Sequence, residues 1–203
     1  MDEMDVDREV AESRKPDRDI LPLFLNRWSP RSFTSEKVPE EQLLACLEAA
    51  GWAPSSNNEQ PWRFLFARSE EDLALFRSCL VEFNQAWANR APVLIAVCAR
   101  TAFSRDGSPN ATCAFDTGAA WMLFALEARR RGLYTHGMAG FNKEKATRLL
   151  RVPEEHEVIA FVALGHRGPA EALPERLRQR ETPSGRKPVE SYAFEGAFPE
   201  STK

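Results

Sequence analysis

Three short segments of this sequence carry side chains that could bind a small molecule. The first, RWSPRSF, places Arg27, Ser29 and Arg31 at every second position. Alternate residues of an extended chain point to the same side, and full extension would separate the two arginines by ~13 Å. Arginines that far apart could hold two ends of one elongated ligand, because the planar guanidinium binds phosphate oxygens bidentately. A solvated basic turn would have the same sequence.

By residue type alone, the other two segments indicate a ligand-binding site less strongly than the first. Residues 54–62, PSSNNEQPW, place small polar side chains where they could satisfy the polar edge of a planar heterocycle. Ser and Asn also form ordinary surface turns, and the residue types alone favour that alternative. Residues 136–142, HGMAGFN, contain two glycines that would let the backbone approach a ligand closely, although a simple loop would look the same.

The hydrophobic pattern predicts the elements that must position these segments. Residues 92–99 are apolar on both faces, which is typical of a central strand covered on both sides. Helices that flank a sheet of few strands, without strict alternation, predict an α+β layered domain. The predicted helices cover residues 20–25, 39–52, 70–83, 112–131 and 143–150, and the predicted strands cover 63–67, 92–99 and 158–165.

The chain divides into three parts. Residues 1–19 carry eight acidic and four basic side chains, which predicts a frayed or loosely docked N-terminal arm. Residues 20–167 form the folded domain. Residues 168–203 contain five prolines and are expected to form a mostly extended tail.

Composition excludes several classes of protein. The 203 residues are 43% hydrophobic and 28% charged, which suits a globular chain with a full core. The sequence has no apolar stretch of ~20 residues and no signal-like start, so we expect a cytoplasmic protein without a membrane partner. A net charge of −3 argues against binding nucleic acid. Four cysteines without CxxC pairing fit reduced thiols, and no metal site is expected.

Together, the order and spacing of the segments resemble the FMN-dependent nitroreductase family, over roughly residues 21–189. The family's first motif, Arg-x-Ser-x-Arg/Lys-x-Phe, matches residues 27–33, and its more specific second motif, Pro-Ser-Ser-x-Asn-x-Gln-Pro-Trp, matches residues 54–62. Residues 140–142 match a Gly-Phe-Asp-like segment. Gly165-His166 and the Arg186-Lys187-Pro188 stretch add further matches.

The resemblance implies a fold and an activity. The fold is a three-layer α-β-α sandwich with a central, mostly antiparallel sheet flanked by helices, and it forms a homodimer with a flavin at the interface. The activity is an FMN-dependent ping-pong reaction in which NADH or NADPH reduces a small-molecule electron acceptor such as a nitroaromatic or quinone. A specialised flavin oxidase or dehydrogenase on the same fold, and a non-catalytic flavin-binding sensor, remain open alternatives.

The resemblance also implies roles for single residues. Arg27 and Ser29 bind the flavin phosphate together with Arg186 from the tail, and Arg31 reaches the N1/O2 edge of the ring. Residues 54–58 come from the neighbouring subunit, and the tail contributes to the flavin site and the dimer. The apolar helix at 112–131 is consistent with such an interface, since a monomer of this size would struggle to cover it.

The remaining assignments concern the flavin ring. Asn84 is expected to hydrogen-bond the pyrimidine, and the backbone at Ala139 and Gly140 lies beside N5, so no side chain is expected to be catalytic. The sequence departs from the family at Trp87, where many members have a lysine, and at Ala139, where some have a glutamate. The full expected cofactor-binding set is Arg27, Trp28, Ser29, Arg31, Pro54, Ser55, Ser56, Asn58, Gln60, Asn84, Met138, Ala139, Gly140 and Arg186.

Overall fold

The computed structural model describes residues 5–199 and is built around a four-stranded antiparallel sheet. The strand order is β1-β2-β4-β3, and the three predicted strands are confirmed with shifts of one or two residues at their ends. Strand β3 was not predicted, because its residues belong partly to the glycine-containing segment at 136–142. The strands are β1 (Trp62–Ala67), β2 (Val93–Arg100), β3 (Tyr134–Met138) and β4 (His156–Gly165).

Strand β2 separates two hydrophobic cores. Ile95 and Val97 face a cluster that contains Phe124, whereas Leu94 and Ala96 face a second cluster on the opposite side of the sheet. Successive side chains of a strand point to opposite faces, so a run that is apolar throughout must be covered twice. The uninterrupted apolar sequence of this strand therefore dictates a three-layer fold.

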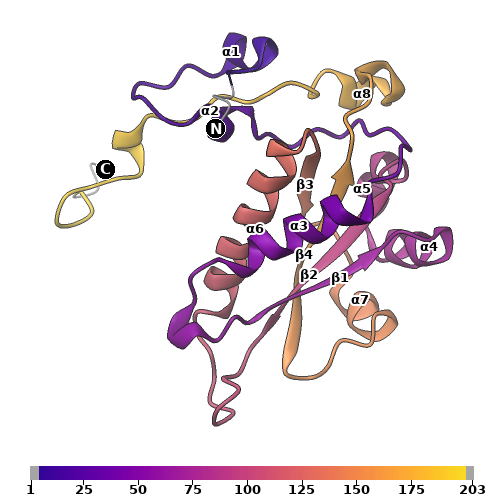
Figure 1. Cartoon of the computed structure of the whole chain (residues 1–203), viewed down its shortest axis with the longest axis vertical. Coiled ribbons are helices and arrows are strands. Elements are labelled where there is room, and N and C mark those ends of the chain that lie inside the picture. The colour runs from indigo at the N-terminus through magenta and orange to yellow at the C-terminus, as the bar shows by residue number, and fades with distance from the viewer. Residues whose placement is uncertain (1–4, 200–203) are drawn as a thin grey trace.

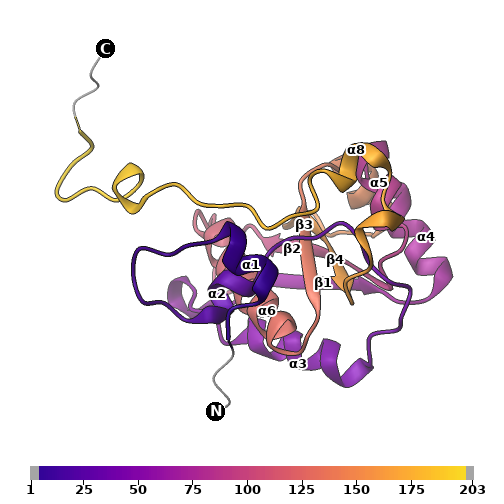
Figure 2. The same ribbon diagram turned by 90° about the horizontal axis from the view of Figure 1, so that it is seen from above.

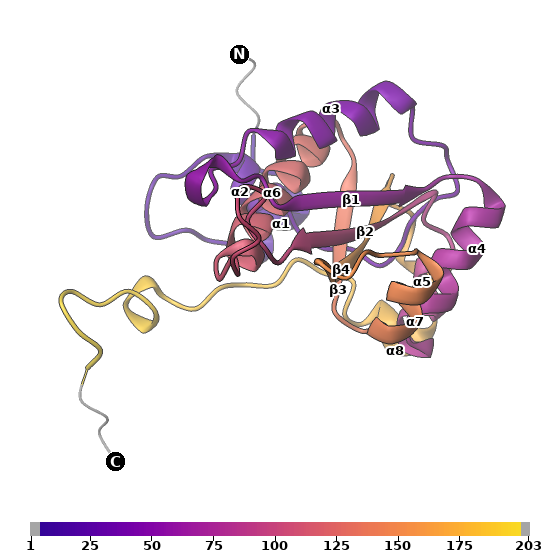
Figure 3. The ribbon, with the colours of Figure 1, turned by 90° about the horizontal axis from the view of Figure 1, so that it is seen from below.

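Helices supply the two outer layers (Figures 1 and 3). One face of the sheet is covered by α3 (Glu40–Gly51) and α6 (Cys113–Arg130). The other face is covered by α4 (Glu70–Cys79), α5 (Glu82–Ala88), α7 (Lys143–Leu149) and α8 (Glu175–Arg178). The predicted three-layer α-β-α sandwich is confirmed.

The prediction of a single helix at residues 70–83 is wrong, because α4 and α5 are separate helices. The break lies at Leu80 and Val81, where no glycine or proline marks it. Leu80 forms an isolated bridge with Phe141, and the Val81 N–H donates to the Gly140 carbonyl oxygen at 3.1 Å. Contacts distant in sequence thus override a continuous helical pattern and leave α5 packed beside Gly140.

The N-terminal segment is docked rather than frayed up to Arg14, whereas residues 15–19 are exposed; residues 1–4 lie outside the described residues. It contains α1 (Arg8–Ser13) and leads into α2 (Pro22–Asn26), and the two helices lie close together in Figure 2. Val10 is fully buried, and Asp7 pairs with Arg129 of α6 at 2.5 Å. Three of the charged residues of this segment, Asp7, Glu9 and Arg14, have partners on distant elements.

The C-terminal tail is only partly extended. Residues 170–181 form η2 (Ala170–Ala172) and α8, whose Leu177 is buried in the core. Residues 183–186 still contact the body of the molecule, and the chain beyond them then leaves it and includes the short turn η3 (Val189–Ser191) (Figures 1 and 2). None of the helices within residues 5–199 is long and apolar enough to cross a membrane.

Candidate functional site

A cavity of about 430 Å³ lies where the chain beyond α2, strand β3 and the C-terminal tail meet. We call it the arginine cavity. It brings together five residues of the expected set from two distant segments. The lining consists of Arg14, Arg27, Trp28, Ser29, Arg31, His136, Arg180, Thr182, Ser184 and Arg186.

The segment after α2 lines the cavity with the three alternating residues and also with Trp28 between them. The chain becomes extended at Arg27, and Arg27, Ser29 and Arg31 all line the cavity, with 3.3 Å between Arg27 Nη1 and Ser29 Oγ. Trp28 is buried and packs edge-on against Tyr134, with 6.1 Å between ring centroids. The tryptophan therefore anchors the segment to β3.

Arg14 holds the main chain of this segment from the N-terminal side. Its Nη1 donates to the carbonyl oxygens of Leu25 at 2.5 Å and Arg27 at 2.9 Å. Its Nε donates to the carbonyl oxygen of Ser184 at 2.9 Å. One buried guanidinium thus ties the N-terminal segment, the end of α2 and the tail to one another.

Two further side chains hold the segment from β3 and from the tail. His136 Nδ1 lies 2.9 Å from the Pro30 carbonyl oxygen, so the ring donates through Nδ1–H because a carbonyl only accepts. The Glu181 carboxylate accepts the N–H groups of Arg31 and Ser32 at 2.9–3.0 Å. The backbone is therefore fixed from three directions.

Positive charge is concentrated in the arginine cavity. Burial and the nearby Arg186 lower the pKa of Arg27, and burial is the main cause of the lowered pKa of Arg31. The pKa of Arg14 falls to about 10 through burial and the charges of Arg186 and Arg27. These groups remain protonated near neutral pH, so a bound anion would relieve both their repulsion and their loss of hydration.

Buried donors without hydrogen-bond partners in the described residues also indicate a bound ligand. Within the described chain, Arg31 Nε and Trp28 Nε1 are buried and have no hydrogen-bond partner. An unsatisfied buried donor costs about 1–3 kcal/mol, more when charged, and such a group in a cavity is satisfied by a bound acceptor. The residues therefore fit a ligand that carries a phosphate and further acceptor atoms.

His136 adds a neutral group to this charged cavity. The pKa of His136 is lowered to about 4, chiefly by burial and also by the nearby arginines, against the opposing effect of its bond to Pro30. Trp87, 2% exposed, lies 4.5 Å from the imidazole between ring centroids and stacks on Phe33. Trp87 is thus a core residue that packs against His136.

The loop at residues 54–60 has a different character. The Ser56 N–H donates to Asp116 Oδ2 at 3.1 Å, and the rest of the loop is largely exposed. Asn57, Asn58 and Gln60 all have φ values of 50–53°, in the left-handed region that residues other than glycine seldom adopt. Strained backbone of this kind is typical of ligand-binding segments.

The end of α2, from which the arginine segment continues, and this loop lie at opposite ends of α6 (Figure 1). Asp116, which holds the loop, is in the first turn of α6, whereas Arg129, in the last turn, donates to the Asn26 carbonyl oxygen at 3.2 Å. Thirteen residues of helix separate them by ~20 Å. One chain therefore does not bring the two parts of the expected site together.

The predicted ring-binding residues form a third group. Asn84 Nδ2 donates to the Gly140 carbonyl oxygen at 2.9 Å, and a Cβ at Gly140 would lie 2.7 Å from that nitrogen. Met138 is buried in the core, so only its main chain is available to a ligand, whereas Ala139 is exposed. The close approach of Asn84 explains why a glycine occupies position 140. The hydrogen bond expected between Asn84 and the flavin pyrimidine stays a prediction.

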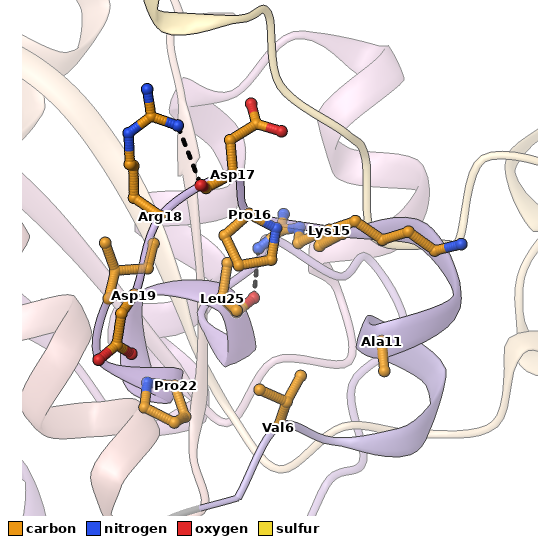
Figure 4. Close-up of a pocket in the computed structure, with 11 residues that line it drawn as sticks. Val6, Ala11, Lys15, Pro16, Asp17, Arg18, Asp19, Pro22 and Leu25 are labelled. Atoms are coloured by element: carbon orange, nitrogen blue, oxygen red, sulfur yellow. Dashed lines mark hydrogen bonds between the residues drawn. The ribbon is translucent and has the colours of Figure 1, made fainter.

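A second cavity, of about 590 Å³, lies between the N-terminal segment and α2 (Figure 4). It contains no residue of the expected set. In Figure 4, Lys15 points away from Asp17 and Arg18, so the charged groups do not converge on one point. The larger cavity is therefore a weaker candidate for a ligand-binding site than the arginine cavity.

Comparison with known proteins identifies the chain's relatives. A model of the nitroreductase family matches residues 25–82 and 71–166, which include both expected motifs. The chain belongs to the nitroreductase family. The matched residues run from α2 to the end of β4 and so cover all four strands.

Particular relatives of this nitroreductase-family chain cover most of its length. A solved structure titled as an oxidoreductase containing FMN is 44% identical, covers 92% of this chain and 96% of its own, and has a TM-score of 0.88. A Thermus thermophilus protein named NADH dehydrogenase is 29% identical over 79% of this chain and 91% of its own. An Archaeoglobus fulgidus protein, provisionally named NADH dehydrogenase/NAD(P)H nitroreductase, is 30% identical over 73% of this chain and 85% of its own.

Sequence reasoning missed five residues that line the arginine cavity of this nitroreductase-family chain: Arg14, His136, Arg180, Thr182 and Ser184. It also missed Glu181, whose carboxylate holds the Arg31 segment. His136 lay within the 136–142 segment but was not in the expected cofactor-binding set. Arg14 and Glu181 lay in the predicted arm and tail, and no local signal distinguishes them, because their partners are more than ten residues away in sequence.

Proposed function

We propose that this chain is an FMN-dependent oxidoreductase that uses NADH or NADPH to reduce nitroaromatic, quinone or similar electron-poor compounds. The observation that carries the proposal is the arginine cavity, with a buried Arg31 Nε that has no hydrogen-bond partner among residues 5–199. The similar structure that contains FMN and the relative named NADH dehydrogenase support the choice of flavin and donor.

Arg27, Ser29 and Arg186 would hold the flavin phosphate. A phosphate accepts charge-assisted hydrogen bonds, which are stronger than neutral ones, and two arginines balance its charge. FMN supplies the two-electron redox chemistry when bound, and the protein supplies binding, orientation and electrostatics.

Arg31 would face the N1/O2 edge of the flavin ring. Negative charge develops at that edge on reduction, so a fixed guanidinium there favours the reduced form. The backbone at Ala139 and Gly140 would lie beside N5, where the absence of a side chain at Gly140 permits close approach. We expect nicotinamide and electron acceptor to occupy the same space in turn, as a ping-pong mechanism requires.

We further propose that the working form is a homodimer. Phe115, Ala119, Met122 and Leu126 form one stripe along α6 at helical spacing. Phe115 is 80% exposed, and the stripe has no charged residue. A second copy that covers this stripe could bring its residues 54–58 to the arginine cavity of the first and give the tail a surface to contact.

Three measurements on the purified protein test this proposal. Heat release and chromatography should identify FMN, light scattering should give twice the chain mass of 22.9 kDa, and steady-state assays with menadione should show NADH or NADPH oxidation. FAD in place of FMN, or no flavin after reconstitution, would contradict the cofactor. A monomer that retains flavin would contradict the shared site, and absence of turnover would leave a flavin-binding protein without the proposed activity.

A further inference from the structure

Glu181 is a buried carboxylate that lies in the chain between Arg180 and Thr182, two residues that line the arginine cavity. Its side chain is almost completely enclosed, with a residue exposure of 3%. Its hydrogen bonds within residues 5–199 all come from main-chain N–H groups rather than from the arginines around it. A buried charge is retained when it is fully hydrogen-bonded, and here the bonds fix the backbone of another segment.

Arg31 is the residue whose position depends on this carboxylate. Ser32 is also held without Glu181, because its carbonyl oxygen accepts the Gly168 N–H at 2.9 Å and its hydroxyl donates to the Pro169 carbonyl oxygen at 2.6 Å. The Arg31 N–H donates to both carboxylate oxygens, at 3.0 and 2.9 Å, and to no other group within residues 5–199. Glu181 thus fixes the point at which the Arg31 side chain leaves the backbone.

Charge supports the same pairing. Burial and Arg180 lower the pKa of Arg31, and Glu181 opposes both effects. The carboxylate therefore helps to keep a second arginine charged in a cavity that is already crowded with positive charge.

We propose that Glu181 is a positioning residue that holds Arg31 toward the arginine cavity and thereby sets how strongly bound FMN favours its reduced form. This inference rests on the proposed FMN-dependent function. Its effect should be found in the ratio of the affinities for reduced and oxidised FMN, whereas a simple tail anchor would change stability alone.

The test uses Glu181→Ala, Glu181→Gln, Arg31→Ala and the double variant Glu181→Ala/Arg31→Ala. Glu181→Ala should speed amide exchange in residues 29–33 of the flavin-free protein. It should also lower the affinity for reduced relative to oxidised FMN by about tenfold, which corresponds to a potential ~30 mV lower. Glu181→Gln keeps an acceptor oxygen, so it should restore slow exchange and should not lower the potential. In the Arg31→Ala background, Glu181→Ala should not change the ratio further.

Leu177→Ala is the matched control, because it loosens the buried side of α8 without removing the carboxylate. It should lower stability and leave the affinity ratio unchanged. An equal shift in this control, an unchanged ratio in Glu181→Ala, or a full shift in the Arg31→Ala background would overturn the inference. A wild-type protein that binds no FMN would refute the proposed function instead, and amide exchange of the flavin-free protein would still decide whether Glu181 fixes Arg31.

Discussion

The two ends of α6 carry parts of the expected site that are built in opposite ways. At its C-terminal end, Arg14, His136 and Glu181 fix the backbone around a positively charged cavity. At its N-terminal end, the loop at residues 54–60 is largely exposed, contains three non-glycine residues at positive φ and is held to α6 by Asp116.

This difference indicates which part of the site one chain completes by itself. The arginine cavity is organised by contacts within the chain and lacks only an acceptor for its buried donors. The loop has a strained backbone and little to pack against, so it gains burial only when another surface covers it. The comparison supports a site that is shared between two copies of the chain.

The largest expected effect comes from separating the two copies. Met122→Glu places a charge in the proposed interface, and an uncompensated buried charge costs about 3–5 kcal/mol. Light scattering should then show a monomer, and FMN should dissociate because the loop leaves the cavity. Leu75→Glu, a similar change at an exposed position of α4 on the opposite layer, should remain a dimer. If monomeric Met122→Glu retained FMN, the loop of a second copy would not be needed for binding at the arginine cavity.

The end of α6 that carries the arginine cavity should be sensitive to acid through His136. The folded protein keeps this residue neutral, with a pKa of about 4, whereas the unfolded chain takes up a proton near pH 6.5. Stability should therefore fall as pH drops from 6.5 and level off near 4, by up to about 3 kcal/mol for this group. Urea unfolding of the flavin-free protein across this range, compared with His136→Gln, isolates the contribution. Parallel pH curves for the two proteins would refute it.

Within the arginine cavity, two arginines should divide binding from redox tuning. Loss of a charged hydrogen bond costs about 1.5–3 kcal/mol, so Arg27→Ala should weaken FMN binding by roughly 10–150-fold. Arg31→Ala should weaken it less and should lower the flavin potential by several tens of millivolts, at ~30 mV for each 1.4 kcal/mol. Titration and redox measurements with reference dyes check both effects, and Arg105→Ala on an exposed hairpin is the charge control. Equal affinity losses with unchanged potentials would place Arg31 away from the ring.

The smallest expected effect lies at the loop. Asp116→Asn keeps the shape of the side chain but removes the charge that accepts the Ser56 N–H. We expect FMN binding to weaken about fivefold, or about 1 kcal/mol, because the loop loses part of its anchor. Asp106→Asn, at an exposed carboxylate of the 101–110 hairpin, should bind FMN as the wild type does. An undiminished affinity in Asp116→Asn would show that loop order is irrelevant to binding.

Local patterns were sufficient for most of the fold. The apolar run of β2 and the periodicity of α3 and α6 determine their own elements, because burial on a fixed face needs no knowledge of the partner. Strand β3 escaped prediction because Tyr134, His136 and a glycine mask the alternation of an edge strand. The break between α4 and α5 depends on the pairing of Leu80 with Phe141, which no local pattern contains.

The site divides in the same manner. Arg27, Ser29 and Arg31 all line the arginine cavity, but Trp28 lines it too, so the alternation of an extended backbone does not by itself determine which side chains reach the cavity. The roles of Arg14 and Glu181 could not be predicted, because each acts on main-chain groups of a remote segment. The loop at 54–60 was identified by its motif, but its separation from the cavity within one chain follows from the length of α6.

The most direct test of the shared site is a mixed dimer. One copy carries Arg27→Ala and Arg186→Ala, and the other carries Ser55→Ala and Asn58→Ala, with different tags so that the mixed dimer can be isolated. If each site combines the cavity of one copy with the loop of the other, the mixed dimer has one intact site and should bind one FMN tightly, whereas both parent dimers bind weakly. A mixed dimer with no tight site would show that each cavity works with the loop of its own chain, and would contradict the account.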